Sequence, residues 1–122
     1  MAFLSDAKSF SASLTKDGRV AFAYLMENAV GCAHAKAWPD IEAHLIQKGI
    51  NMSKNTFQAS VIKPSREGKV FIGSTDVDFK GYFIIAKLED ADVVRAWYKK
   101  RIAKERSNLD NLEKLIKEEW NV

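Results

Sequence analysis

The sequence predicts a mostly α-helical chain with one small β-hairpin, an α+β fold that ends in a long helix. Apolar residues recur at helical spacing through the first half of the chain. Two short runs of β-branched and aromatic residues follow, at residues 70–72 and 82–85, with glycines beside them. From Asp90 to the last residue there is no glycine or proline, so no residue of that stretch is a typical helix terminator.

At 122 residues the chain is long enough for one domain with a buried core. Its 47% hydrophobic and 29% charged residues are ordinary values for a soluble globular protein. No stretch approaches the roughly 20 apolar residues that span a bilayer, and the N-terminus lacks the pattern of a secretion signal. Cys32 is the single cysteine and has no partner for an internal disulfide. We therefore expect a cytoplasmic protein that does not enter a membrane.

The net charge of +3 conceals two basic islands. The first basic island, residues 48–69, carries five Lys or Arg against Glu67. The second basic island, residues 95–106, carries six against Glu105. Clustered cations are typical of proteins that bind a polyanion, but a solvated helix face rich in Lys and Arg has the same composition. Both interpretations stay open at this point.

Residues 1–17 are expected to form an N-terminal helical extension. Ser5 is suited to cap a short helix that reaches about Leu14. Asp17 is then placed to cap a stronger helix, whose apolar residues recur at helical spacing until Gly31 ends it. The segment that follows, CAHAKAW, is small and apolar and either extends this helix or forms a loop.

A pair of helices with a short turn follows. Pro39 suits the first turn of a helix over about residues 38–48, which Gly49 ends. Ser53 is a good N-cap for the next helix, and Pro64 is expected to end or kink that helix. The spacing is that of a helix-turn-helix, whose second helix enters the major groove of DNA with its N-terminal residues at the base edges.

The second helix of this pair, residues 53–63, is the candidate reading helix. Asn55 and Gln58 carry amides that both donate and accept hydrogen bonds, so they are the candidates for reading bases. Lys54 and Lys63 are better suited to phosphates. The full set of predicted DNA contacts is Ser53, Lys54, Asn55, Thr56, Gln58, Lys63, Arg66, Lys69 and Lys80. The alternative is a polar helix face that is only exposed to water.

Residues 70–72 and 82–85 predict the two strands of a hairpin, joined by a polar connection over residues 73–81. The connection carries Asp76 and Asp78 against one lysine. An acidic tip that approaches a phosphate backbone is repelled by it. The tip therefore either touches DNA through its lysine and hydroxyl groups alone, or it faces elsewhere.

The hairpin contains two short motifs, IGS at residues 72–74 and KGY at residues 80–82. With these motifs and the order of the preceding helices, residues 18–90 resemble the winged helix-turn-helix family, in particular its small phage and prophage members. The resemblance implies a winged helix domain with a reading helix and a wing. Most members of the family bind DNA and a minority bind proteins or RNA, so the fold alone leaves the partner open.

Residues 91–122 are expected to form a long C-terminal helix that serves for dimerisation. Its apolar residues follow near-heptad spacing on one seam, which Glu105 interrupts. The predicted seam residues are Tyr98, Ile102, Leu109, Leu112 and Ile116. Such a helix extends about 45 Å, longer than the domain it would have to cover. We therefore favour a homodimer over the alternative, a helix that folds back on its own domain.

Support for metal binding or catalysis is weak. Cys32, His34 and His44, with Asp40 nearby, are the candidate metal ligands, but their spacing matches no tight pair of ligands followed by another pair. The sequence also offers no nucleophile with an evident base and no glycine loop for phosphates. We therefore expect no metal, no cofactor and no enzymatic activity.

Two functions from different classes remain. The favoured one is a dimeric, sequence-specific protein that binds double-stranded DNA, such as a phage or mobile-element transcription regulator or a replication accessory factor. The alternative is a winged helix that binds a protein, such as a phage factor that engages or inhibits a host protein. The first basic island favours DNA, whereas the acidic hairpin tip and the apolar seam favour a protein partner.

Overall fold

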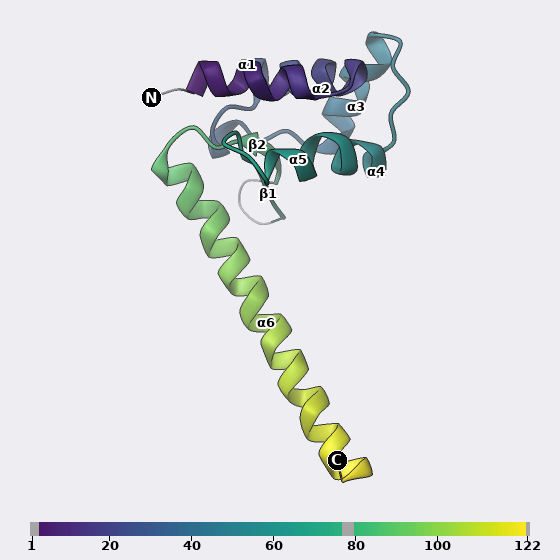
Figure 1. The fold of residues 1–122 in the computed structure, drawn as a ribbon, viewed down its shortest axis with the longest axis vertical. Coiled ribbons are helices and arrows are strands. Elements are labelled where there is room, and N and C mark those ends of the chain that lie inside the picture. The colour runs from purple at the N-terminus through teal and green to yellow at the C-terminus, as the bar shows by residue number, and fades with distance from the viewer. Residues whose placement is uncertain (1–2, 77–79, 122) are drawn as a thin grey trace.

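The computed structural model describes residues 3–76 and 80–121 of the chain. These residues form a helical body, an antiparallel two-stranded hairpin and a long C-terminal helix that extends away from the body (Figure 1). The predicted α+β fold class is confirmed. Asp78, one of the two aspartates in the predicted hairpin tip, lies outside the described residues.

The chain begins with two helices, α1 (Phe3–Ser13) and α2 (Lys16–Asn28). Phe10 of α1 packs edge-on against Phe22 of α2, with 4.9 Å between the ring centroids. The expectation that Asp17 caps α2 is wrong, because Thr15 is the N-cap and its Oγ1 accepts a hydrogen bond from the Gly18 amide. Asp17 lies in the first turn instead, where its charge still suits the positive end of the helix.

The segment CAHAKAW does not extend α2. It forms a 3-10 turn, η1 (Cys32–His34), and then leads into α3 (Trp38–Gln47), with Pro39 in the first turn as predicted. The φ angle of Gly31 is +92°, which lets the chain turn between α2 and η1. The bend places this segment beside the hairpin rather than on the surface of α2.

The candidate reading helix forms one continuous helical run with three parts, α4 (Lys54–Phe57), η2 (Gln58–Ile62) and α5 (Lys63–Ser65). Helical structure thus continues one residue past Pro64 instead of ending there. The middle part, η2, is a π turn in which the Lys63 amide donates to the Gln58 carbonyl. Proline has no amide hydrogen, and its ring crowds the carbonyl one turn earlier, so a widened turn at this place accommodates it.

The hairpin consists of β1 (Ile72–Thr75) and β2 (Gly81–Ile84), in a register that pairs Ile72 with Ile84 and Thr75 with Gly81. The predicted bounds of the first strand, residues 70–72, are therefore wrong, and the predicted connection is too long. The reason lies at Gly73, where an added Cβ would meet Val94 Cγ2 at 2.5 Å. Glycine allows the last helix, α6 (Leu88–Trp120), to pack on β1, so Gly73 lies inside the strand and does not begin a loop.

The strand β2 has backbone partners on both edges. One edge pairs with β1, and the other pairs with the segment between α2 and α3. On that second edge the amide and carbonyl of Tyr82 bond to Lys36 at 2.8 and 2.9 Å, and Ile84 bonds to Ala29 and Gly31 at 2.7 and 2.9 Å. The open edge that an isolated hairpin would present is therefore satisfied along β2.

The core lies between α2, α3, the candidate reading helix and the hairpin. It is aliphatic and aromatic, as the helical spacing of the sequence predicts. Among the described residues, its fully buried large side chains are Leu25, Ile41, Leu45, Phe57, Val61, Ile62, Val70, Ile72 and Ile84. Phe83 is equally buried but lies outside this cluster, on the face of the hairpin where Gly73 and Val94 meet. A buried serine, Ser65, joins the end of the candidate reading helix to β1, because its Oγ donates to the Ile62 carbonyl and accepts from the Ile72 amide.

The last helix, α6 (Leu88–Trp120), is anchored to the body by Asp90. The carboxylate of Asp90 is fully buried and accepts hydrogen bonds from the amides of Cys32, Ala86 and Lys87 at 2.9, 3.0 and 3.2 Å. Burial opposes ionisation of this carboxyl, but the hydrogen bonds outweigh burial and hold the pKa of Asp90 below its ordinary value of 3.8.

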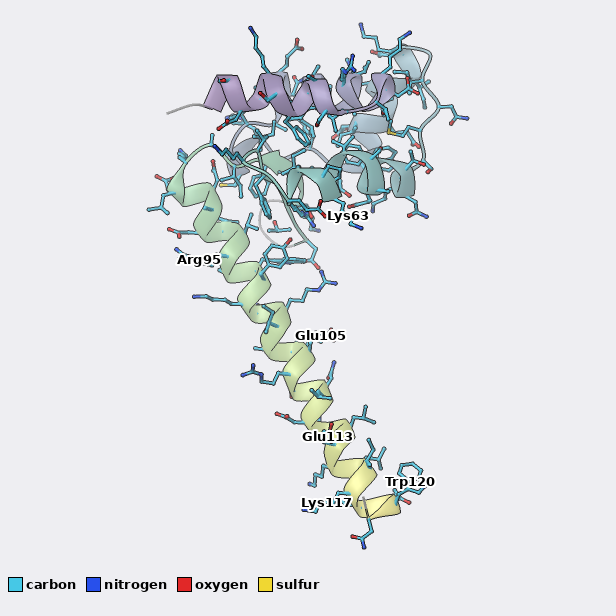
Figure 2. All side chains as sticks on the ribbon, in the orientation of Figure 1. Lys63, Arg95, Glu105, Glu113, Lys117 and Trp120 are labelled. Carbon is cyan, nitrogen blue, oxygen red and sulfur yellow. The ribbon has the colours of Figure 1, made fainter. Side chains whose placement is uncertain are left out.

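Beyond its first turns α6 leaves the body, and side chains such as Glu105, Glu113 and Trp120 have no other described part of the chain beside them (Figure 2). The alternative in which this helix folds back on its own domain is therefore not the observed arrangement. No helix among residues 3–76 and 80–121 combines the length and the apolar character needed to cross a membrane.

We expect Asp90→Asn to lower the free energy of unfolding by about 2 kcal/mol at neutral pH, because bonds to a charged acceptor are lost. Since the folded-state pKa of Asp90 is depressed, this stabilisation is complete above pH 3.8 and is lost as the pH falls through the folded-state value. Urea unfolding at neutral and acid pH measures both effects. Asp92→Asn, an exposed position on the same helix, is the matched control. Equal midpoints for Asp90→Asn and the unchanged chain at neutral pH would contradict the prediction.

Candidate nucleic-acid interface

The N-terminal end of the candidate reading helix presents polar side chains to solvent. Lys54, Asn55 and Thr56 are exposed there, and so is the N-cap Ser53. As predicted, the Ser53 hydroxyl caps the helix, accepting from the Thr56 amide at 3.1 Å. This hydroxyl also donates to Thr56 Oγ1 at 2.9 Å. The predicted contacts Lys54 and Asn55 are therefore accessible, whereas the hydroxyls of Ser53 and Thr56 are engaged with each other.

Phe57 fixes the rotation of the candidate reading helix. Its ring lies 5.1 Å from the ring of Trp38 on α3 and 5.2 Å from the ring of Tyr82 on β2. Val61 and Ile62 are buried on the same side of the helix. Because these side chains point inward, the side that carries Asn55 is held outward.

Gln58, one of the two predicted base readers, is bound within the chain. Its Nε2 donates a hydrogen bond to the hydroxyl of Tyr82, and the side chain is half-buried. Burial raises the pKa of Tyr82, with Arg66 opposing the shift, so the phenol stays protonated at neutral pH. The structure thus assigns Gln58 a role in positioning the helix against the hairpin, and Asn55 is the exposed amide.

Arg66, a predicted phosphate contact, holds the hairpin. Its Nε donates to the Ile72 carbonyl at 3.2 Å and its Nη2 to the Ser74 hydroxyl at 3.3 Å. The guanidinium also lies over the ring of Phe71, 5.8 Å from the centroid. Arg66 therefore joins the end of the candidate reading helix to β1, and its half-buried position leaves less of it for a phosphate.

The remaining predicted cations, Lys63, Lys69 and Lys80, are exposed. Lys63 points away from the body, on the side of the candidate reading helix that faces solvent (Figure 2). A shallow hollow along this side is lined by Asn55, Gln58 and Lys63, among others. Basic and amide groups thus border the same hollow, although Glu67 also lies there.

The described aspartate of the hairpin tip faces α6. The Trp97 indole N–H donates to the Asp76 carboxylate at 2.9 Å, and the Arg101 guanidinium lies over the Trp97 ring at 5.1 Å. The Trp97 bond, with the charges of Arg101 and Lys100, keeps the pKa of Asp76 below its usual range. The tip is therefore joined to the second basic island. Sequence reasoning missed this contact because Trp97 lies 21 residues from Asp76.

The predicted seam on α6 is largely uncovered. Ile102, Leu109 and Leu112 are exposed, whereas Tyr98 and Ile116 are half-buried. Leu115 and Trp120 are also exposed and extend the apolar surface beyond the predicted set. The exposed fractions of these two residues and of the three exposed seam residues range from 47% to 67%. Leu115 was detectable from sequence because it follows Leu112 by one helical turn.

The residues considered for metal binding are occupied in other contacts or lie apart. The Cys32 amide bonds to Asp90, and the His44 ring packs on Tyr24 with 4.7 Å between centroids. In the part of the chain that the structure describes, no three His, Cys, Asp or Glu side chains are grouped so that they could hold a metal ion.

Comparison with protein-family models, with curated proteins and with solved structures finds no match to this chain. The candidate interface therefore rests on the chain's own residues. Its accessible groups are those of the N-terminal end of the candidate reading helix and the exposed lysines of the first basic island.

We expect Tyr82→Phe to lower the free energy of unfolding by about 1 kcal/mol, because the half-buried amide of Gln58 loses its hydrogen-bond partner. Denaturant titration of the purified variant measures the loss. Tyr98→Phe, which removes a hydroxyl on α6, is the matched control and should change stability less. A Tyr82→Phe chain as stable as the unchanged one would show that this hydrogen bond contributes nothing.

Proposed function

We propose that this chain is a sequence-specific DNA-binding protein of the winged helix-turn-helix type, which acts in the cytoplasm as a homodimer and catalyses no reaction. The observation that carries the proposal is the outward-facing N-terminal end of the candidate reading helix, with Lys54 and Asn55 exposed. In a helix-turn-helix this end of the second helix lies at the base edges. An amide there suits an adenine, and a lysine suits a guanine or a phosphate.

The order of elements supports the family assignment. Three helices, α2, α3 and the candidate reading helix, precede a two-stranded hairpin that stands in the place of the wing. The hairpin is fixed to the reading helix through Ser65 and Arg66. A wing held in this way would present Lys69 and Lys80, both exposed, beside the reading helix. Asp76 is directed to α6 through Trp97 and so is not the part of the wing proposed to approach DNA.

The homodimer is supported by the exposed apolar residues of α6. A dimer carries two reading helices related by a two-fold axis, so its DNA site would be a pseudo-palindrome. Proteins with these properties serve as phage or mobile-element transcription regulators or as replication accessory factors, and we propose a role of this class.

The DNA proposal predicts a steep dependence of affinity on salt. We expect the logarithm of the binding constant to fall linearly with the logarithm of salt concentration, with a slope of about −0.9 per neutralised phosphate. Lys63→Ala should make the slope shallower by roughly one unit and weaken binding to all sequences alike. Asn55→Ala should instead leave the slope unchanged and weaken discrimination between sequences by about 1–3 kcal/mol.

Fluorescence anisotropy with oligonucleotides selected from a random pool gives both readouts. Lys8→Ala, at an exposed position on α1 and outside both basic islands, is the control and should change neither the specificity nor the slope by as much. Absence of detectable binding at low salt would remove the DNA proposal.

The dimer proposal predicts a monomer after one substitution. Light scattering at micromolar concentration should give twice the chain mass for the unchanged protein and the chain mass for Leu112→Glu, because a carboxylate would be buried in the apolar seam. Lys114→Glu, which changes charge beside the seam, should remain dimeric. A monomeric unchanged protein would argue against the homodimer without bearing on DNA binding by a single copy.

A second candidate function is a winged helix that binds a protein partner. The exposed apolar side chains of α6 favour it, because an uncovered strip of this kind is a common protein-binding surface. A preparation that retains a cellular protein after nuclease treatment, and that fails to bind any DNA at low salt, would favour this function over the first.

A further inference from the structure

We propose that the α6 helices of two copies pair antiparallel, so that the N-terminal half of each helix lies against the C-terminal half of the other. The proposal rests on the homodimer of the proposed function and deepens it by fixing the orientation of the copies and the residues that meet. The occupant of the exposed face of α6 is thus a second copy of this chain.

The face that would be covered is a continuous strip. One hollow on it is lined by Tyr98, Ile102, Glu105 and Leu109, with two arginines beside them. A second hollow shares Tyr98 and runs toward the body, where Phe71 and Ile85 form its far wall. The strip therefore begins at the base of the hairpin and follows the predicted seam along α6.

A parallel pair brings like charges together on this strip. Arg95, Glu105 and Glu119 occupy seam positions of the same heptad repeat as Ile102 and Leu109. In a parallel pair each seam residue faces its own copy. Three layers would then join arginine to arginine or glutamate to glutamate at close range, and like charges in such positions oppose association.

An antiparallel pair removes these like-charge layers and leaves the Glu105 carboxylate of each copy beside a leucine. When Ile102 is set opposite Leu112, the same register sets Tyr98 opposite Ile116 and Glu105 opposite Leu109. Two of these three layers are wholly apolar apart from the tyrosine hydroxyl. The two glutamates at position 105 lie about four residues apart along the axis, or roughly 6 Å, instead of face to face.

The same register joins opposite charges at its ends. Arg95 of each copy is set opposite Glu119 of the other, and Lys99 lies within one turn of Glu113. The halves of the helix also differ in sign, because residues 95–106 carry six cations and one anion whereas residues 107–122 carry two cations and four anions. The helix is therefore complementary to a reversed copy of itself, which is the reason to choose a second copy over an unrelated protein.

Trp120 provides a further reason. It is 67% exposed near the end of α6, where none of the other residues that the structure describes covers it (Figure 2). In the antiparallel register Trp120 lies opposite Val94 of the other copy, next to the hollow that Phe71 and Ile85 help to line. A tryptophan that fills a hollow in the partner is a frequent energetic centre of protein interfaces.

Disulfide cross-linking tests the orientation. In a Cys32→Ser background, two single-cysteine chains are made, Ile102→Cys and Leu112→Cys, and are oxidised separately and as a mixture without DNA. Both positions are exposed on α6, so the body should fold unchanged. We expect a cross-linked dimer in the mixture and none from either chain alone. In the antiparallel pair, the same residue in the two copies lies about ten residues apart along the axis, or roughly 15 Å. This separation is beyond the reach of a disulfide.

Cross-linking of each chain with itself would overturn the proposal in favour of a parallel pair. A dimer by light scattering without any cross-link in the mixture would overturn the orientation and leave the dimer standing. A monomer by light scattering would remove both, and loss of DNA binding alone would bear on neither. Trp120→Ala supplies a second measurement, because it should weaken dimerisation by roughly 30-fold. An unchanged dissociation constant for that variant would remove Trp120 from the interface, whereas the cross-links decide the orientation.

Discussion

The buried carboxylate of Asp90 is the interaction on which the arrangement of this chain depends. It accepts hydrogen bonds from three backbone amides in two separate segments, one that follows α2 and one that follows β2. A carboxylate that has lost its water needs such donors, since burying the charge without them is costly. The first turn of α6, the exit of the hairpin and the bend at Cys32 are thereby held at one point, and the direction in which α6 leaves the body is set there.

The second constraint is the position of β2 between two neighbours. The backbone of Tyr82 forms ladder hydrogen bonds with Lys36, its ring packs on Phe57, and its hydroxyl accepts a hydrogen bond from the side-chain amide of Gln58. A shift of the hairpin would therefore rotate the candidate reading helix as well. Under the proposed function, the orientation of the exposed Asn55 is determined by contacts on the opposite side of its helix, in a core that DNA would not touch.

Sequence reasoning succeeded where the deciding chemistry is local. The hydroxyl of Ser53 and the missing amide hydrogen of Pro39 act within one turn, so the starts of their helices were predictable. It failed at the start of α2, where Thr15 and not Asp17 is the cap, and it failed where a distant residue decides. The amide groups that made Gln58 a candidate base reader also suit Tyr82, which lies 24 residues away.

The bounds of the hairpin strands also depend on a residue that is distant in the sequence. Val70 and Phe71 have strand propensity, yet the ladder begins at Ile72 and runs on through Gly73, where Val94 of α6 packs in the space that a side chain would take. The charge of Asp90 near a helix start was visible in the sequence, but its burial was not.

The two basic islands likewise differ in ways that composition conceals. In the second, Arg101 covers Trp97, which holds Asp76, and Arg95 is paired with Asp92. Part of that island therefore compensates acids of its own chain, so under the proposed function the exposed lysines of the first island are the better placed charges for DNA.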